Sequence, residues 1–238
     1  GGYPRIQVQS YSDTICPNEP YVLRAISSGG RKPLIYDWDN GLGTEQLEAV
    51  APTETTVYNV TVSDACNTPS GEASITLVVD GNEFEAFVDT TENCQPGTFV
   101  FTYDTDRSGD AFYWDFGNGF NASALDTTSF TFDRVGCQDI KLKQVTALGC
   151  EFVKTYPCMV NVRRSPIADF EHDPKYPDII NAQVSFNNLS SYASSYQWYM
   201  SDTLISESSS IVRLFSDSGD FAVTLVAENE YLCTDTIT

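Results

Sequence analysis

The stretch Phe112-Tyr113-Trp114-Asp115-Phe116-Gly117-Asn118-Gly119 joins a short aromatic run to a glycine-rich turn. The chain has three tryptophans, and the other two, Trp38 and Trp198, also lie in short aromatic runs. The three are spaced about 80 residues apart, which is the size of one small domain. About 20 residues after each tryptophan comes a turn, followed by a segment in which apolar and polar residues alternate. The spacing therefore predicts one structural plan used three times.

Alternation of apolar and polar residues predicts β-strands along the whole chain. It is clearest at residues 6–9 and in the segments that follow the tryptophans, residues 57–62, 136–142 and 219–225. A period of two is typical of strands that bury one face. No segment has a convincing helical period; residues 44–50 come nearest, and we expect them to form strand or loop. The chain is predicted to be all-β.

The segment Trp114-Asp115-Phe116-Gly117-Asn118-Gly119 resembles the Trp-Asp-Phe-Gly-Asp-Gly signature of PKD domains, which are immunoglobulin-like β-sandwiches of about 80–90 residues. Trp38-Asp39-Asn40-Gly41 matches this signature in part, and the third segment keeps Trp198 but departs from it at residues 199–202. In the family, the segment is a strand and the turn after it, with the tryptophan in the core between the two sheets. The resemblance implies the same burial for Trp38, Trp114 and Trp198.

The repeat and the resemblance together imply three tandem immunoglobulin-like (PKD-type) β-sandwich domains, at residues 1–81, 82–165 and 166–238. The third is expected to be truncated at its C-terminal end, and the chain to be an internal piece of a longer protein. The junctions near residues 80–82 and 163–166 are very short, which leaves little room for hinge motion. We therefore expect an elongated and fairly stiff rod.

The surface is predicted to be strongly acidic. The chain has 33 Asp and Glu residues against 13 Lys and Arg residues, which gives a net charge of −20. Such a surface repels phosphate backbones and anionic lipid, so nucleic-acid binding is not expected. No apolar run approaches the length of a membrane span, so membrane insertion is not expected either.

Seven cysteines in β-rich modules favour an oxidising, extracellular location. Cys16 and Cys94 occupy equivalent places before a strand, in the first and second modules. Cys66 and Cys150 likewise occupy equivalent places, after the alternating strand that follows the tryptophan segment. This repetition predicts the disulfides Cys16–Cys66 and Cys94–Cys150.

A third bridge, Cys137–Cys158, is predicted across a hairpin whose turn falls near residues 148–149. Cys233 is left over and is predicted to be free. Zinc is not expected, because there is no Cys-x-x-Cys pair and His172 is the only histidine. All three predicted bridges lie within modules, and a bridge between two modules would count against this organisation.

Catalysis is not expected. His172 lies in a short polar segment that is typical of a solvated loop. The sequence has no Ser-His-Asp arrangement, zinc-protease motif, nucleophile elbow or phosphate-binding loop. Paired carboxylates are common, but on so acidic a chain they cannot be distinguished from solubilising charge.

The acidic segment at residues 104–110 is the best candidate for a metal site. Some PKD domains bind calcium through an Asp-Pro-Asp-Gly loop, helped by the aspartate of the tryptophan signature. The resemblance implies that Asp104, Asp106 and Asp115 would be the matching calcium ligands. Thr105 replaces the proline and the glycine comes later, so a simple polar connector is the alternative.

The third module carries the most specific resemblance. Residues 186–190, 195–198, 219–229 and 233–237 resemble the PKD-type module that precedes the C-terminal sorting domain of gliding-motility surface proteins. Such proteins are similar to long, repetitive adhesins exported by type IX secretion. The resemblance implies a non-catalytic stalk or adhesin segment at the cell surface. Its partners would be neighbouring repeats of the same long chain, outer-membrane secretion or motility proteins, and surface glycans.

Two other functions remain open. PKD domains also accompany secreted proteases and polysaccharide hydrolases, so the chain could be an accessory region of such an enzyme. A glycan-binding module is a third reading, in which exposed tyrosines such as Tyr192, Tyr199 and Tyr231 would bind sugars. Edge packing of these tyrosines on a sandwich is the simpler alternative.

Overall fold

The computed structural model describes residues 2–81, 84–106, 108–123, 127–178 and 182–238. Residue 82, at which the second module is predicted to begin, lies outside them. Every regular element of the described residues is a β-strand, so the fold is all-β. The alternation in the sequence is the physical cause, because every second side chain of a strand points to the same face. In β8, for example, every second residue from Gly71 to Leu77 is buried.

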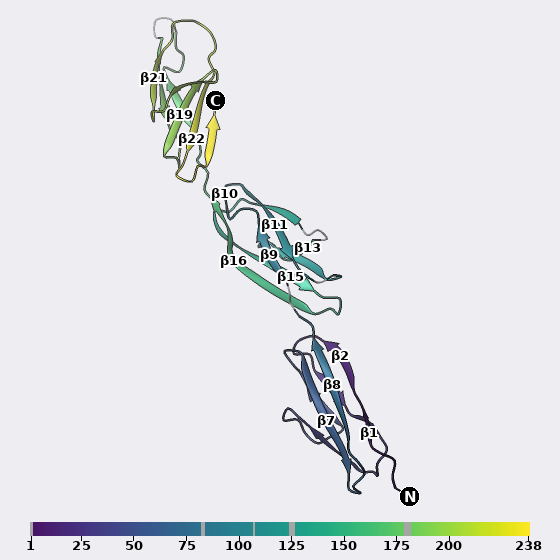
Figure 1. Cartoon of the computed structure of the whole chain (residues 1–238). Coiled ribbons are helices and arrows are strands. Elements are labelled where there is room, and N and C mark those ends of the chain that lie inside the picture. Colours follow the sequence, from purple (N-terminus) through teal and green to yellow (C-terminus); the bar gives the residue numbers. More distant parts are fainter. Residues whose placement is uncertain (1, 82–83, 107, 124–126, 179–181) are drawn as a thin grey trace. The chain divides into compact units, whose positions relative to one another are not determined.

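The first group of strands forms three small sheets from residues 7–79. The sheets have the orders β2-β8-β7-β5, β3-β6 and β1-β4, and β2 runs parallel to β8. In Figure 1, β7 and β8 lie side by side. The strands are β1 (Gln7–Gln9), β2 (Tyr11–Ile15), β3 (Tyr21–Arg24), β4 (Ile26–Ser28), β5 (Leu34–Trp38), β6 (Leu47–Val50), β7 (Thr56–Asp64) and β8 (Gly71–Val79).

The second group forms two sheets from residues 85–163. Their orders are β10-β16-β15-β12-β13 and β14-β11-β9, and β10 runs parallel to β16. The strands are β9 (Glu85–Val88), β10 (Glu92–Cys94), β11 (Gly97–Asp104), β12 (Ala111–Asp115), β13 (Asn121–Ser123), β14 (Thr127–Phe132), β15 (Gly136–Val145) and β16 (Glu151–Arg163).

The third group forms two sheets from residues 170–237, with the orders β17-β18-β21 and β20-β19-β22-β23. The strands are β17 (Phe170–Asp173), β18 (Gln183–Asn188), β19 (Ser195–Met200), β20 (Thr203–Ser206), β21 (Ile211–Leu214), β22 (Val223–Glu228) and β23 (Thr234–Ile237). We refer to the three groups, β1–β8, β9–β16 and β17–β23, as the first, second and third sandwiches.

The three sandwiches share one strand order. In each, the strand that carries the tryptophan pairs with the next-to-last strand, which in turn is a neighbour of the last: β5-β7-β8, β12-β15-β16 and β19-β22-β23. Other sheets combine earlier strands with β6, β14 or β21, each of which comes after the tryptophan strand of its sandwich. This arrangement is the immunoglobulin one.

Each tryptophan is buried in the core of its own sandwich. Trp38, Trp114 and Trp198 are 4%, 1% and 0% exposed. The rings of Phe101 in β11 and Trp114 in β12 lie 5.6 Å apart, so they connect the two sheets of the second sandwich. In the third, Phe186 of β18 and Trp198 of β19 make the same kind of contact at 6.0 Å.

The chain divides into two compact units. One consists of Gly1–Glu85, Thr105–Tyr113 and Lys143–Lys154, and the other of Ala86–Asp104, Trp114–Leu142 and Thr155–Thr238. The first unit contains the disulfide Cys16–Cys150, and the second contains Cys94–Cys233 and Cys137–Cys158. Each unit therefore combines segments of two sandwiches and includes one long-range covalent link.

Candidate functional site at the disulfide-linked turns

The long-range disulfides join the end of one strand to a turn of the next sandwich. Cys16 directly follows β2 and is bonded to Cys150, which directly precedes β16. Cys94 ends β10 and is bonded to Cys233, which directly precedes β23. Both bridges thus start at the end of the second strand of one sandwich, which runs parallel to the last strand of that sandwich. They lead to the turn before the last strand of the following sandwich.

The predicted pairs Cys16–Cys66 and Cys94–Cys150 are wrong, and Cys233, predicted to be free, is bonded. Cys66 is the free and exposed cysteine instead. The reason is strand direction. Ile15 lies opposite Val79 at the end of β8, whereas Cys66 precedes the start of β8 at Gly71. Nine strand residues span about 30 Å, and the Cα atoms of a disulfide lie within about 7 Å.

The second sandwich has the same constraint. Cys94 lies opposite Arg163 at the end of β16, and Cys150 directly precedes its start at Glu151. The cysteine at the end of the second strand and the cysteine just before the last strand therefore lie at opposite ends of that last strand. Each can pair only with a cysteine of a neighbouring sandwich. Both long-range bridges join segments assigned to different modules, yet no sheet of the described residues pairs strands across the predicted boundaries.

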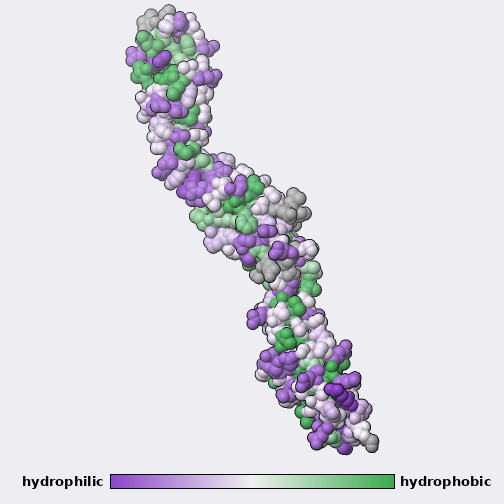
Figure 2. Space-filling model, in the orientation of Figure 1, coloured by the Kyte–Doolittle hydropathy of each residue, from purple (hydrophilic) through white to green (hydrophobic). Residues whose placement is uncertain are grey.

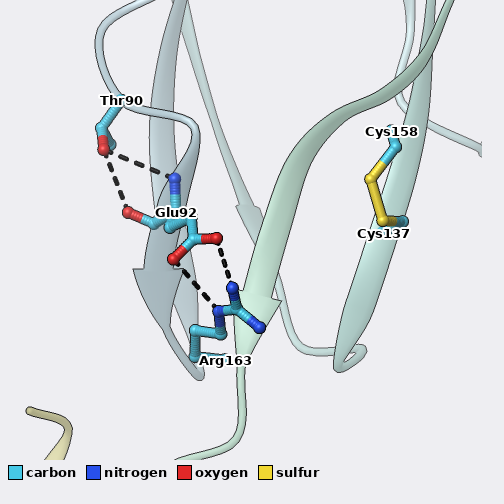
Figure 3. A network of polar contacts seen from close by, with 5 residues as sticks. All are labelled: Thr90, Glu92, Cys137, Cys158 and Arg163. Carbon is cyan, nitrogen blue, oxygen red and sulfur yellow. Dashed lines mark hydrogen bonds and ion pairs between the residues drawn. A yellow bond between two sulfur atoms is a disulfide. The ribbon is translucent and has the colours of Figure 1, made fainter. Parts of the chain in front are cut away.

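The bridge Cys137–Cys158 is present and links β15 to its neighbour β16. Figure 3 shows this bridge beside the ion pair described below. The backbone N–H of Cys158 donates to the Asp139 carboxylate at 2.8 Å, and Cys158 has a positive φ of 47°. The bridge therefore staples one sheet internally, at a place where β16 departs from regular strand geometry.

The turns before the last strands, residues 64–70, 146–150 and 229–233, are built alike. Each begins with a residue whose side-chain oxygen accepts backbone N–H groups. Asn229 Oδ1 accepts from Tyr231 and Cys233, at 3.0 and 3.1 Å. Thr146 Oγ1 accepts from Cys150 at 3.2 Å.

In the first sandwich, Asp64 Oδ1 accepts from Cys66 at 2.9 Å and from Thr68 at 3.2 Å. Three residues after each of these capping side chains, the backbone has a positive φ: 54° at Asn67, 89° at Gly149 and 62° at Leu232. Asp, Asn and Thr favour such turns because their short side chains reach nearby backbone donors. We call these three segments the last turns.

Polar contacts surround the Cys94–Cys233 bridge. The side-chain amide of Asn229 donates to the carbonyl of Arg164 at 2.6 Å, and the Arg163 guanidinium lies 4.4 Å from the centre of the Tyr231 ring. Arg163 also forms an ion pair with Glu92, which is drawn in Figure 3. Hydrogen bonding to Glu92 is the main cause that raises the pKa of Arg163 above its ordinary value. The guanidinium is thus held between the second sandwich and the last turn of the third.

The connection between β16 and β17 is also fixed on both sides. The Ser165 hydroxyl donates to the carbonyl of Gln95 at 2.5 Å, and the backbone N–H of Ala168 donates to Asp235 at 2.8 Å. These two bonds tie the connecting segment to the second and the third sandwich respectively. Both are short-range restraints on the same junction that the disulfide spans.

The compact unit that contains the Cys16–Cys150 bridge also buries apolar side chains from both of its sandwiches. Cys150 and Phe84 are 3% and 4% exposed. The Phe84 ring packs edge-on against Phe112 at 5.7 Å, and Lys154 Nζ lies 4.8 Å from the centre of the Phe84 ring. The backbone N–H of Asp80 donates to the carbonyl of Ile15 at 2.9 Å, so the end of β8 is fastened next to Cys16.

The predicted calcium ligands do not converge in the structure. Asp104 and Asp106 are exposed, whereas Asp115 is 9% exposed. Asp115 Oδ1 accepts from the backbone N–H groups of Gly117 and Gly119, at 2.8 and 2.9 Å. Within the described residues, no group of three or more His, Cys, Asp or Glu side chains could hold a metal ion. Asp115 instead organises the turn after the tryptophan.

Each of the other side chains singled out from the sequence has its own partner. His172 is exposed on β17, and a ring nitrogen lies 3.2 Å from the carbonyl of Pro174. Tyr192 and Tyr231 are about half exposed, but each ring is contacted by an arginine, Arg164 and Arg163. Tyr199 donates its hydroxyl hydrogen to Gln197 at 2.9 Å.

The visible face in Figure 2 intersperses hydrophilic residues with small apolar areas. None of the described residues forms a helix long and apolar enough to cross a membrane.

No known protein family matches the sequence, and no curated protein matches it. Among solved structures, the chain is similar to titin domains I67–I69 in an E-to-A variant, with 11% identity and a TM-score of 0.43 over 97% of this chain and 95% of that one. It is similar to extracellular domains 3–5 of Drosophila OTK, with 10% identity and a TM-score of 0.37 over 98% and 94%. It is also similar to fibronectin(III)-like modules of Clostridium thermocellum CbhA, with 14% identity and a TM-score of 0.30 over 64% and 91%. By its own strand order and buried cores, the chain is an all-β protein of tandem immunoglobulin-like sandwiches.

Proposed function

We propose that the chain is a non-catalytic segment of a large cell-surface adhesin or stalk and that its work is to carry tension. The observation that carries the proposal is the interleaving of its disulfides. Each long-range bridge joins one sandwich to the next, across the peptide junction between them. Three disulfides among seven cysteines also favour an extracellular location, because such bonds persist in oxidising surroundings.

The bridges shorten the covalent path between the two ends of the chain. The shortest path crosses, in order, Cys16–Cys150, Cys158–Cys137 and Cys94–Cys233. It contains about 70 residues of backbone and would extend to about 25 nm, against about 80 nm for the chain without bridges. Tension applied at the ends therefore bypasses most of the backbone, even after the sandwiches lose their non-covalent structure.

Restraints at the junction between β16 and β17 support the same role. Hydrogen bonds from Asn229 and Ser165 and the contact of Arg163 with the Tyr231 ring all lie at the residues that connect two sandwiches. Individually, such exposed contacts contribute little to stability, because solvent competes for the same groups. The disulfide keeps these groups close to one another, so that contacts broken by force can form again.

The finer form of the proposal comes from the resemblance of the sequence to PKD modules of gliding-motility proteins. It places the chain in a protein that is exported by type IX secretion and serves gliding or adhesion. Neighbouring repeats of the same long chain would be its direct partners, with outer-membrane secretion or motility proteins and surface glycans as further ones. The net charge of −20 suits a hydrated segment that does not adhere to anionic lipid.

Cells that make the full protein provide the test. They should be compared with cells in which residues 1–238 are deleted in frame, for detachment under increasing shear and for hydrolytic activity in the medium. The proposal predicts that the deletion lowers the shear at which cells detach and leaves secreted protease and polysaccharide-hydrolase activity unchanged. Unaltered detachment with loss of a secreted hydrolase would instead favour an accessory region of an enzyme.

A further inference from the structure

The last turn of the first sandwich, residues 64–70, contains the one cysteine that is unpaired among the described residues. Cys66 is exposed, and its sulfur lies 3.6 Å from Nη1 of Arg31. In the other two last turns, the cysteine is bonded to the sandwich that precedes it. Both bridges run in the same direction: the turn cysteine pairs toward the N-terminus, and the strand-end cysteine pairs toward the C-terminus.

We propose that Cys66 forms a disulfide with a further sandwich of the same kind that precedes residue 1 in the same polypeptide. Its partner is the cysteine that ends the second strand of that sandwich, in the place held here by Cys16 and Cys94. The inference rests on the proposed function as one segment of a longer array. It makes the last turn of the first sandwich a docking surface for a neighbouring repeat.

The position of Cys66 within its turn needs a separate argument. Cys150 and Cys233 follow their capping residues by four positions, whereas Cys66 follows Asp64 by two. The third sandwich shows what the earlier position contacts. Tyr231 follows Asn229 by two, and its ring lies against Arg163 of the preceding sandwich. In the third sandwich, both positions of the last turn therefore contact the second sandwich.

The distribution of cysteines shows at which end the set of linked sandwiches could continue. The first sandwich contains a strand-end cysteine and a last-turn cysteine, as does the second. The third contains Cys233 and no cysteine near its second strand. The pattern of bridges therefore ends at the third sandwich on one side and is open at Cys66 on the other.

A second copy of this chain fits the site less well. Its Cys16 and Cys94 are already bonded, so only its own Cys66 could pair. Such a bridge would join two last turns, and neither long-range bridge in the structure does so. The observed head-to-tail pairing instead continues along one polypeptide.

Bond formation requires an oxidant, which we take to be the disulfide of a thiol–disulfide oxidase in the export compartment. The thiolate of the preceding sandwich attacks that disulfide and forms a mixed disulfide, releasing one catalyst thiol. The Cys66 thiolate then attacks the sulfur of the preceding sandwich and releases the second. One protein S–S bond forms, and the two protons and two electrons pass to the catalyst, which leaves as a dithiol.

Disulfide mapping of the full protein from the cells that make it tests the proposal. Native protein is treated with N-ethylmaleimide and digested with pepsin at acid pH, where low thiolate content suppresses exchange. Cys66 should escape alkylation and appear in a peptide linked to a cysteine from before residue 1. An alkylated Cys66, a Cys66–Cys66 peptide or an adduct with a small thiol would each overturn the proposal.

The 238-residue chain and a variant provide controls. In the chain alone, N-ethylmaleimide should modify Cys66 and leave the other six cysteines untouched; a protected Cys66 there would contradict the proposal. In the full protein, Cys66→Ser should abolish the linked peptide and keep Cys16–Cys150. The shear experiment tests the proposed function separately. If Cys66 were free in cells whose adhesion still depends on residues 1–238, the disulfide proposal would be wrong and the proposed function would stand.

Discussion

Cys94 and Cys233 are 139 residues apart in the sequence and are joined by a disulfide, with their Cα atoms 5.6 Å apart. Cys94 ends a strand of the second sandwich, and Cys233 lies in the last turn of the third. Cys16 and Cys150, 134 residues apart, repeat this relationship between the first and second sandwiches. The repeated unit of the chain is therefore a sandwich together with its covalent link to the next.

Removing the bridge by the paired substitution Cys94→Ser and Cys233→Ser should destabilise the second compact unit. In the chain-entropy model, a loop of this length contributes up to about 5 kcal/mol to the free energy of unfolding. Urea unfolding followed by tryptophan fluorescence measures the change. Cys66→Ser is the matched control and should shift the free energy by less than about 0.5 kcal/mol, because its side chain is exposed and not in a disulfide. Equal effects of the two variants would show that the bridge does not form.

Two of the buried tryptophans, Trp114 and Trp198, should respond differently to substitution by phenylalanine. The Trp198 indole N–H donates to the carbonyl of Ser208 at 3.0 Å, whereas that of Trp114 has no acceptor within the described residues. Trp198→Phe leaves a carbonyl without its donor, so it should cost about 1–2 kcal/mol more than Trp114→Phe. Thermal unfolding of the two variants provides the comparison. A larger loss for Trp114→Phe would contradict this account of the cores.

The last turn of the first sandwich should weaken in acid. Hydrogen bonds from the backbone of Arg31 and from Thr68 lower the pKa of Asp64 to about 2. Because this pKa lies below the ordinary value of 3.8, the charged carboxylate stabilises the folded state at pH above about 4. That contribution is lost as the pH falls from about 4 to about 2.

Titration of the Asp64 carboxyl carbon by NMR measures the pKa directly. Asp64→Asn should flatten the dependence of stability on pH within this window. A midpoint close to 3.8 for Asp64 would mean that its hydrogen bonds to the turn are absent in solution.

Calcium should leave the unfolding temperature unchanged. Asp115 Oδ1 already accepts from Gly117 and Gly119, and Lys141 Nζ lies 3.8 Å from Oδ2. Differential scanning calorimetry with calcium and then with chelator checks the expectation. Asp115→Ala should lower the unfolding temperature in both conditions, because the turn loses its acceptor. A calcium-dependent rise that disappears in Asp106→Ala would restore the metal site.

The fold could be predicted from the sequence because local signals and burial agree. Each tryptophan sits in an alternating strand, and the alternation dictates which face enters the core. The turn after Trp114 was also recognisable, since its glycines at 117 and 119 have positive φ values of 97° and 89°. The turn-capping role of Asp115 could not be predicted, because an aspartate that caps a turn and one that binds calcium look alike in sequence.

The pairing of cysteines was not predictable from their equivalence. Repetition in the sequence shows that Cys16 is equivalent to Cys94 and that Cys66 is equivalent to Cys150. It does not show which cysteines lie close together in space. Nearness in space depends on β2 and β10 running parallel to β8 and β16. This direction puts the strand-end cysteine and the last-turn cysteine of one sandwich at opposite ends of its last strand. The shared capping of the three last turns was also not predictable from the sequence. Three different residue types, Asp64, Thr146 and Asn229, accept the backbone hydrogen bonds at equivalent positions.

Single-molecule force extension of the 238-residue chain, held at its two ends, tests the central claim most directly. With the disulfides intact, the fully unfolded chain should extend to about 25 nm, because the covalent path crosses all three bridges. After reduction, the same chain should extend to about 80 nm. An extension near 80 nm without reductant would contradict the account, because tension would then pass along the whole backbone and not through the linked turns.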